Sequence, residues 1–512
     1  MRKQSSLHAM KELWIHILSA FIALGCLSLA SQAYASDEDV LNFGMGVDAT
    51  TLDPHNWKTA PDLVAINLIY EGLVAFDADL SVTPVLATSW ERLDDVTWKF
   101  NLRKNVTFQD GTPFNAQAAK VNFDRMKDAP RAKGIFGIID SVETPDDYTL
   151  LIRTKHPFAP FLNNMCHPVG SMISPAALEK YGKDIGRHPV GTGKFVFEKW
   201  LPNQRIVLKR NDNYWGPKPS LTTVNLIPIP EEGTRTMAFE SGEIDIVSAP
   251  APHRVAKFKK DDDVTVTVTP AARTVWLGYN LKDKVLSNPK VREAIALAIN
   301  RKELVNDVAE GLALDATGWI PSIIQKSDQN FNYPYDPAKA KKLLAEAGYP
   351  NGLDIKLWTP EGRYLKDRQI AEALQAQLSD VGIRAHLSVM EWAAYVAALF
   401  RSEQQLFIWG WAFQVGDPDS MLRENFYSTS SYGCTGYQNQ EFDKMLDKAV
   451  STFDPESRKK QYDAIQQLLF KDVVGAPIYF SENIFAMHNN VNGFIPHPLE
   501  LIVLDKTKVK ED

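Results

Sequence analysis

Helices with strong start signals alternate with strands in the second half of this chain of 512 residues. Three predicted helices open on an Asn or Asp followed by proline, because the short polar side chain caps the helix and proline fits its first turn. These three helices start at Asn288, Asp336 and Asp454, and a fourth predicted helix starts at Asp367. The predicted strands between them span 353–358 and 383–389. This alternation predicts an α/β lobe with a mostly parallel sheet.

The first half of the chain has a different texture. Short runs of β-forming residues, broken by Gly, Pro, Asn and Asp, extend from Leu41 to about Val247, and residues 97–102 and 149–153 alternate with the period of a strand. The predicted domains are a first lobe over 36–274 with an inserted subdomain over about 76–190, a second lobe over 275–474, and a return segment over 475–512 that can pair back onto the first lobe. The fold class is therefore α/β with two lobes.

The N-terminus has the pattern of a secretory signal peptide over residues 1–35. Basic residues precede an apolar run from Leu13 to Ala30, and Ala33-Tyr34-Ala35 matches a small-x-small cleavage site. We therefore predict export to the periplasm and a mature chain that starts near Ser36. An uncleaved membrane anchor is one alternative. A lipid anchor at Cys26 is another, which is disfavoured because the apolar run continues past this cysteine.

Charge and cysteine content exclude some classes of protein. The formal net charge of −7 argues against nucleic acid as a partner, since such a partner requires a basic surface. Removal of the leader leaves Cys166 and Cys434. One disulfide and two free thiols both remain open, because spacing alone does not show whether the two backbones approach each other.

Signatures of catalysis are missing or broken. Residues 44–49 match a dinucleotide fingerprint by spacing, but residues 50–54 include a proline where the helix that binds the pyrophosphate must begin. Gly193-Lys194 is similar to the end of a phosphate-binding loop, yet Phe195 replaces the final Ser or Thr. No nucleophile elbow occurs, and the histidines do not fall at close metal-binding spacings. We predict no enzyme activity and no cofactor, although a metal site assembled from distant loops stays open.

Several motifs follow one another along the mature chain. They are 84–90 (PVLATSW), 98–103 (WKFNLR), 108–116 (FQDGTPFNA), 190–193 (VGTG), 213–216 (NYWG) and 289–295 (PKVREAI). In this order they resemble the signature of the periplasmic peptide- and nickel-binding proteins of ABC importers. The resemblance implies a periplasmic-binding-protein fold with mixed sheets, in which two hinged lobes enclose the ligand and the first lobe carries an extra subdomain.

A tryptophan-rich strand end at 407–411 runs into a Gly-Asp-Pro-Asp turn at 416–419. This segment is similar to that of dipeptide-binding proteins, in which an aspartate receives the α-ammonium of the ligand. The ligand contacts predicted here are Asp417, Asp419, Trp411 and Trp409. A carboxylate in a desolvated cleft makes a strong charge-assisted hydrogen bond. The alternatives are that the aspartates only cap the turn and that the tryptophans only fill the core.

Residues 362–368 lie between a predicted strand and a predicted helix, at the strand end where open α/β sheets place ligands. The resemblance implies an arginine near here for the ligand carboxylate. Arg363 is the first candidate, and Arg368 is the second because it lies one turn into the helix. Hinge or pocket residues are also predicted at the lobe junction, namely Arg273, Trp276, Tyr279 and Asn280.

The function implied by the resemblance is the capture of a short peptide or a glutathione-like ligand and its delivery, by a monomer, to the membrane permease subunits of an ABC importer. The alternative is the binding of a nickel-type metal chelate. His167 falls where nickel-binding relatives face their metal, but an ordinary core or surface histidine is the favoured interpretation.

Overall fold

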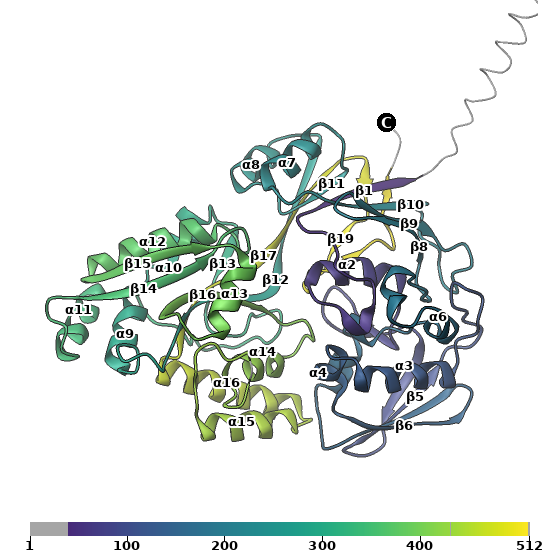
Figure 1. Ribbon diagram of the computed structural model, residues 1–512, viewed down its shortest axis with the longest axis horizontal. Helices are drawn as coiled ribbons and strands as arrows, with labels where there is room; N and C mark the ends of the chain where they lie inside the picture. The colour runs from purple at the N-terminus through teal and green to yellow at the C-terminus, as the bar shows by residue number, and fades with distance from the viewer. Residues whose placement is uncertain (1–38, 431, 510–512) are drawn as a thin grey trace, which may run out of the picture.

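The computed structural model describes residues 39–430 and 432–509. The predicted signal peptide and Cys26 lie outside the described residues. Two long strands connect the two lobes, β12 (Val264–Tyr279) and β17 (Gly475–His488), and they pair antiparallel with each other (Figure 1). They lie at the centre of an 11-stranded mixed sheet with the order β15-β14-β16-β12-β17-β11-β1-β10-β9-β8, and β13 pairs with β17.

The pairing of β12 with β17 shifts register between Pro270 and Thr274. On one side of this shift β17 pairs with β11 (Ile246–Ser248) of the first lobe, and on the other side β12 pairs with β16 (Leu406–Ala412) of the second lobe. The strand partners therefore change lobe within residues 271–273 of β12, close to the boundary that the sequence predicts at 274/275. In β17 they change near residue 481, within the return segment that the sequence predicts over 475–512.

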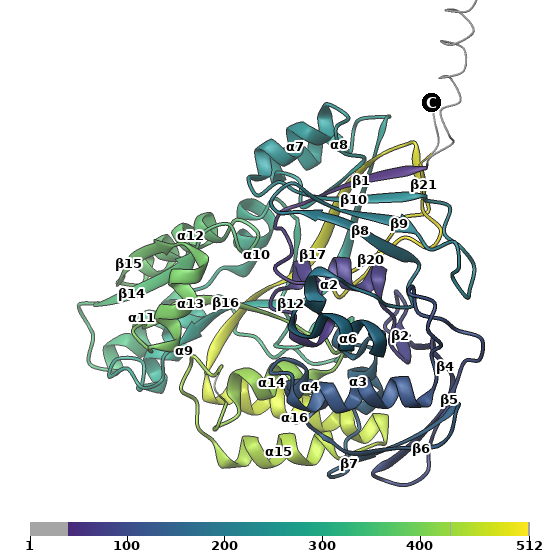
Figure 2. The same ribbon diagram turned by 45° about the vertical axis from the view of Figure 1, so that its right-hand side comes forward.

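The first lobe continues the sheet with short strands and covers it with helices. Its strands are β1 (Val40–Met45), β8 (Phe195–Leu201), β9 (Arg205–Arg210) and β10 (Thr223–Pro228). Its helices are α2 (Ala60–Ile69), α6 (Pro175–Tyr181), α7 (Glu232–Glu240) and α8 (Pro252–Phe258). The C-terminal segment adds the pairs β18 (Val491–Asn492) with β21 (Lys508–Val509) and β19 (Ile495–Pro496) with β20 (Ile502–Val503), and it lies over the first lobe in both ribbon views (Figure 2).

A subdomain inserted in the first lobe has a separate antiparallel sheet with the order β4-β5-β7-β6. Its strands are β4 (Ala87–Arg92), β5 (Thr97–Leu102), β6 (Ile139–Asp146) and β7 (Thr149–Thr154), preceded by the hairpin β2 (Val74–Phe76) and β3 (Val82–Pro84). Its helices are α3 (Ala116–Asp128), α4 (Ala132–Phe136) and α5 (Phe161–Met165). The subdomain has its own apolar core between the sheet and these helices. The strands that the sequence predicts at 97–102 and 149–153 are confirmed.

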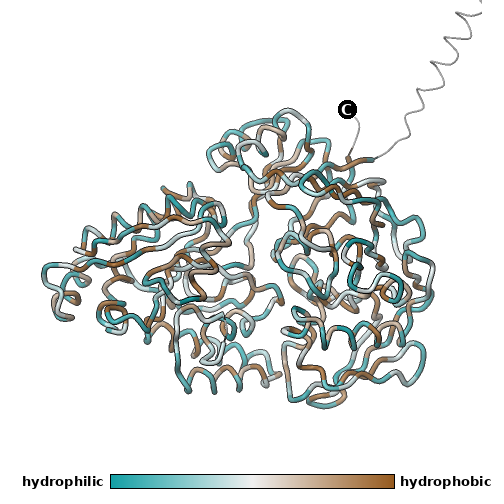
Figure 3. Tube along the Cα trace, viewed as in Figure 1, coloured by the Kyte–Doolittle hydropathy of each residue, from teal (hydrophilic) through white to brown (hydrophobic). Residues whose placement is uncertain are grey.

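The second lobe is built on the parallel strands β14 (Leu353–Pro360), β15 (Ile383–Met390) and β16. Its other elements are α9 (Pro289–Leu297), α10 (Arg301–Glu303), β13 (Ala313–Asp315), α11 (Pro337–Glu346), α12 (Asp367–Asp380), α13 (Trp392–Phe400), α14 (Pro418–Phe426), α15 (Gln440–Val450) and α16 (Pro455–Asp472). In both lobes the most apolar stretches follow the strands, and hydrophilic residues cover the outer helices and loops (Figure 3).

Three predicted helix starts are confirmed at the level of single hydrogen bonds. The side chains of Asn288, Asp336 and Asp454 accept hydrogen bonds from backbone N–H groups in the first turns of α9, α11 and α16, and a proline follows each of them. Capping of this kind stabilises a helix by about 1 kcal/mol. No helix in the described part of the chain combines the length and the apolar character needed to cross a membrane.

Close packing of the 190–193 motif against α2 generates the first testable prediction. A Cβ atom at Gly193 would lie 2.6 Å from the backbone carbonyl of Ile69, so Gly193→Ala requires the backbone to shift. We expect this substitution to lower the free energy of unfolding by about 2 kcal/mol, measured by urea denaturation. Gly134→Ala in α4 is the control, because a Cβ there meets nothing within 4 Å and alanine favours the helix. Equal effects of the two substitutions would contradict this account of packing.

Candidate functional site

Hydrogen bonds between the lobes show which surfaces face each other. The Asn163 side chain donates to the Gly416 carbonyl (3.0 Å), the Ala159 N–H donates to the Val450 carbonyl (2.7 Å), and Arg131 donates to the Tyr432 hydroxyl (3.1 Å). The donors belong to the inserted subdomain, and the acceptors belong to the second lobe around α14. The end of β16, α13 and α14 therefore lie on the side of the second lobe that is turned toward the first (Figure 1).

The loop that carries Arg363 is fixed by one carboxylate. Asp367, at the start of α12, accepts hydrogen bonds from the backbone N–H groups of Gly362 (3.2 Å), Arg363 (2.8 Å) and Tyr364 (3.1 Å). The Tyr364 hydroxyl in turn accepts a hydrogen bond from the backbone N–H of Gly410 in β16 (2.9 Å). The sequence therefore holds Arg363 at the carboxyl end of β14 through contacts within one short segment and one neighbouring strand.

The Arg363 guanidinium group lies 5.2 Å from the ring centres of both Tyr364 and Trp392. Arg273 is close enough to repel it, and burial together with this neighbouring positive charge lowers the pKa of Arg363. Glu500 does not pair with Arg363, because both of its carboxylate oxygens accept hydrogen bonds from Arg273 (2.7 and 2.9 Å). Within the described residues, Arg363 therefore has aromatic neighbours but no carboxylate partner.

A row of aromatic rings leads away from Arg363 along the inner side of the second lobe. Trp392 stacks on Trp409 at 5.7 Å, Trp409 lies 6.3 Å from Trp411, and Trp411 meets Tyr432 edge to face at 5.7 Å. Trp409 is buried and donates to the Asn425 side chain (3.0 Å), whereas Trp392, Trp411 and Tyr432 are partly exposed. Trp392, Trp411 and Tyr432 line the region between Arg363 and Arg131. We call this region the interlobe site.

The two aspartates of the predicted acidic turn already have cationic partners. Asp417 caps α14 and makes a two-fold hydrogen-bonded ion pair with Arg458 (2.6 and 2.9 Å). Asp419 makes a similar pair with Arg423 (2.9 and 3.0 Å). Both aspartates are almost completely buried, with exposed fractions of 3 and 6%. These contacts correspond to the capping alternative, because each carboxylate already has an arginine of its own lobe as its partner.

Three more predicted site residues lie apart from the interlobe site. The Arg368 side chain is exposed and pairs with Glu372 and Glu361 on the surface of α12. Tyr279 is fully buried in the core of the second lobe, and the Asn280 amide donates to the Gln404 carbonyl (2.9 Å). The side chains of these three residues lie on the surface and in the interior of the second lobe, and their role as ligand contacts stays a prediction.

His167 and the cysteines are structural. His167 is 1% exposed, and this burial lowers its pKa to about 4. Its Nδ1 accepts a hydrogen bond from the backbone N–H of Val169 (3.0 Å). Its Nε2 is near the Gln414 side chain without forming a hydrogen bond of normal geometry. Cys166 and Cys434 are buried free thiols, not a disulfide. Over the described residues, no three His, Cys, Asp or Glu side chains gather into a metal-binding cluster.

Sequence reasoning missed two charged residues at the interlobe site. Glu424 projects from α14 and is partly buried, and Arg131 stands at the start of α4 in the first lobe. Burial raises the pKa of Glu424 to about 7, and the nearby Arg131 only partly offsets this rise. Neither residue belongs to a motif. Their proximity depends on how the lobes face each other, so no local pattern could have identified them.

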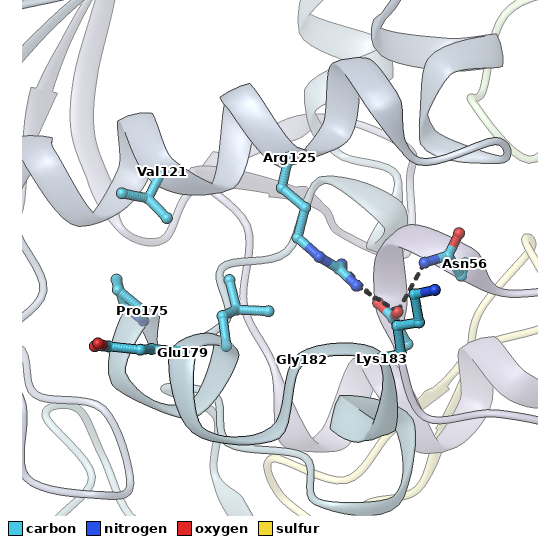
Figure 4. A pocket seen from close by; sticks show the side chains of 9 residues that line it. Asn56, Val121, Arg125, Pro175, Glu179, Gly182 and Lys183 are labelled. Carbon is cyan, nitrogen blue, oxygen red and sulfur yellow. Dashed lines mark hydrogen bonds and ion pairs between the residues drawn. The ribbon is translucent and has the colours of Figure 1, made fainter.

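An open hollow of about 600 Å³ lies elsewhere on the first lobe, between α3 and α6 (Figure 4). The Arg125 guanidinium group points to the Asp53 carboxylate, with distances of 2.8 and 2.6 Å, and the Asn56 side chain donates to the same carboxylate (2.8 Å). These polar groups satisfy one another. The Arg125 and Asp53 charges of this hollow are therefore paired with each other, whereas Glu179 and Lys183, which also line it, are exposed.

Comparison with known proteins relates this architecture to a class of binding proteins. A family model described as "Bacterial extracellular solute-binding proteins, family 5 Middle" matches residues 81–433. The glutathione-binding protein GsiB of Escherichia coli O1:K1 is 34% identical over 493 residues, which cover 93% of this chain and 96% of that protein. The periplasmic binding protein DppA of Helicobacter pylori, solved in complex with the peptide STSA, is 30% identical with a TM-score of 0.81 over 92% of this chain and 98% of that one. NikA of Brucella suis, solved with Fe(III)-EDTA, is 26% identical with a TM-score of 0.83, covering 92% of this chain and 100% of that one.

The ion pair of Asp417 leads to a prediction about stability. Asp417→Asn should lower the free energy of unfolding by about 3 kcal/mol. The Arg458 side chain is poorly exposed, and the substitution removes the anion that pairs with it. Asp447→Asn is the matched control, since Asp447 pairs with Arg423 at an exposed position and should cost less than about 1 kcal/mol. Urea denaturation of the empty protein measures both. Comparable losses in the two variants would show that the buried pair has no special role.

Glu424 generates a prediction about pH. Its folded pKa of about 7 exceeds the ordinary value of 4.5, so the stability due to this group is fully present below pH 4.5 and is lost as the pH rises through 7. Arg131 and Asp419 are the charged groups that act on it. Glu424→Gln removes the ionisation, and we expect the variant to gain about 1–3 kcal/mol over the wild type between pH 5 and pH 8. Glu441→Gln on the exposed start of α15 should show no such trend in thermal denaturation. A stability difference that does not change with pH would refute the shifted pKa.

Proposed function

Because the chain belongs to family 5 of the bacterial extracellular solute-binding proteins, we propose that it captures a short peptide of the glutathione type between its two lobes. The chain is a solute-binding protein of an ABC importer and not an enzyme. Its fold is that of the periplasmic peptide-binding proteins. The proposal concerns the class of ligand and the residues that hold it.

The observation that carries the proposal is that Arg363, although Glu500 lies near enough to attract it, forms no ion pair within the described residues. A partly buried guanidinium group beside a second arginine is unfavourable unless an anion joins it, and Glu500 is already taken by Arg273. A ligand carboxylate fits this position, since it can accept two parallel hydrogen bonds from the guanidinium fork. Such a charge-assisted contact contributes about 1.5–3 kcal/mol to binding.

The aromatic row supports a ligand with a peptide body. The exposed parts of Trp392, Trp411 and Tyr432 offer flat apolar surfaces with polar edges, which suit side chains and amide groups alike. Binding pockets for small molecules have this composition, with a mostly apolar lining and a few polar groups that set the orientation. A metal chelate with carboxylate arms is the second candidate, because Arg363 and the rings suit it equally and NikA of Brucella suis holds Fe(III)-EDTA.

The route of the ligand follows from the class of protein. We propose that residues 1–35 direct export and are removed, that the mature monomer works in the periplasm, and that it delivers its ligand to the membrane permease subunits of the importer. The GsiB and DppA relatives, named as glutathione-binding and as ABC transporter-associated and periplasmic, support this proposal.

Arg363→Gln tests the carboxylate contact. We expect the affinity for glutathione to fall by about thirty-fold or more, because one ligand carboxylate is enclosed without a partner. Glutathione amidated at its glycine should bind weakly to the wild type and lose little further in the variant. Titration calorimetry on protein freed of bound ligand by denaturation and refolding measures these affinities.

Arg368→Gln is the matched control, because this arginine lies on the exposed surface of the same segment. It should leave the affinity unchanged. If glutathione and its amide bind the wild type equally well, Arg363 does not hold the carboxylate. If iron–EDTA binds and no peptide does, the chelate candidate replaces the peptide.

A further inference from the structure

Two residues of opposite charge, one from each lobe, lie near Tyr432 without forming an ion pair. Arg131 of the first lobe donates a hydrogen bond to the Tyr432 hydroxyl (3.1 Å), and its guanidinium group lies 5.8 Å from the Trp57 ring centre. Glu424 of the second lobe is close enough for Arg131 to influence its pKa. Among the described residues, no side chain donates a hydrogen bond to the Glu424 carboxylate, and no carboxylate pairs with Arg131.

Contacts within the second lobe place Glu424 beside the aromatic row. The Ser430 hydroxyl group donates to the backbone carbonyl of Glu424 and accepts the backbone N–H of Tyr432 (3.1 Å). Tyr432 in turn meets Trp411 edge to face. Glu424 and Arg131 therefore stand at the Tyr432 end of the row, and Arg363 stands at the other end beside Trp392.

The neighbouring acidic residues differ from Glu424 in one respect. Asp417 and Asp419 each spend both oxygens on an arginine of their own lobe. Burying a carboxylate without such a partner is costly, and perturbed carboxylates of this kind gather at functional sites. Arg131 is exposed and therefore bears no such burial cost, but it has no carboxylate partner among the described residues.

We propose that Glu424 and Arg131 together bind the ammonium and carboxylate groups of one amino-acid head group, so that the site selects γ-glutamyl peptides over ordinary α-peptides. This inference rests on the proposed function, because it assumes a peptide ligand whose other end contacts Arg363. In a γ-glutamyl peptide the free ammonium and a free carboxylate sit on the same carbon. In an ordinary peptide the terminal ammonium stands alone, because the adjacent carboxyl carbon is part of the amide bond, and Arg131 keeps no anionic partner.

Three ligands and two variants test the pair. Glutathione carries both charges of the head group, glutaryl-Cys-Gly lacks the ammonium, and 4-aminobutyryl-Cys-Gly lacks the carboxylate. Glu424→Gln should weaken glutathione by about thirty-fold and leave glutaryl-Cys-Gly almost unchanged. Arg131→Gln should weaken glutathione and leave 4-aminobutyryl-Cys-Gly almost unchanged. The matched controls are Glu441→Gln and Lys133→Gln, at exposed positions near the same helices, and these should alter no affinity.

The isomer α-Glu-Cys-Gly provides an independent measurement on the unaltered protein. It has the composition of glutathione, and we expect the wild type to bind it at least ten-fold more weakly. Equal affinity for the two isomers would overturn the proposal and leave the proposed function standing. If both variants weaken the binding of all three ligands equally, the proposal is also overturned. That result is expected when Glu424 and Arg131 only hold the two lobes together and do not contact the head group. If the wild type binds none of these peptides, the proposed function fails and this proposal fails with it.

Discussion

The antiparallel pairing of β12 with β17 is the interaction on which the two-lobed structure depends. Each strand contributes one half to the first lobe and the other half to the second, so a single backbone ladder holds both lobes. The register shift between Pro270 and Thr274 interrupts this ladder where the partners change. Hinges in domain closure are a few residues that absorb backbone changes, and this short interruption lies where the two lobes meet.

Pairing of charges within each lobe determines which groups are left for a ligand. Asp417 with Arg458, Asp419 with Arg423 and Glu500 with Arg273 are complete pairs that stabilise loops and helix starts. Within the described residues, Arg363, Glu424 and Arg131 have no such ionic partner. Arg363 and Glu424 are partly buried, so their unpaired charges cost stability in the empty protein, and a ligand of matching charge removes that cost, whereas Arg131 is exposed. The ligand contacts that we propose are thus the charged residues that lack an ionic partner.

Local features of the fold were predictable from the sequence, and long-range partners were not. The caps at Asn288, Asp336 and Asp454 act on their own first turns, so their signals lie within four residues. The position of Arg363 follows from its own loop in the same way. Asp417, by contrast, owes its role to Arg458, which lies 41 residues later in a different helix. A resemblance to dipeptide-binding proteins could mark the acidic turn but could not show that this carboxylate is already neutralised.

The distribution of the unpaired charges over both lobes gives the ligand a mechanical role. Arg363 and Glu424 belong to the second lobe, and Arg131 belongs to the first. A ligand that contacts one lobe alone binds the open and closed forms equally and shifts no equilibrium between them, however tightly it binds. A ligand that also reaches Arg131 gains its last contact only when the lobes approach, so this contact favours the closed form. If Arg131 holds the head-group carboxylate as proposed, the residue that distinguishes one head group from another is also the residue through which binding favours closure.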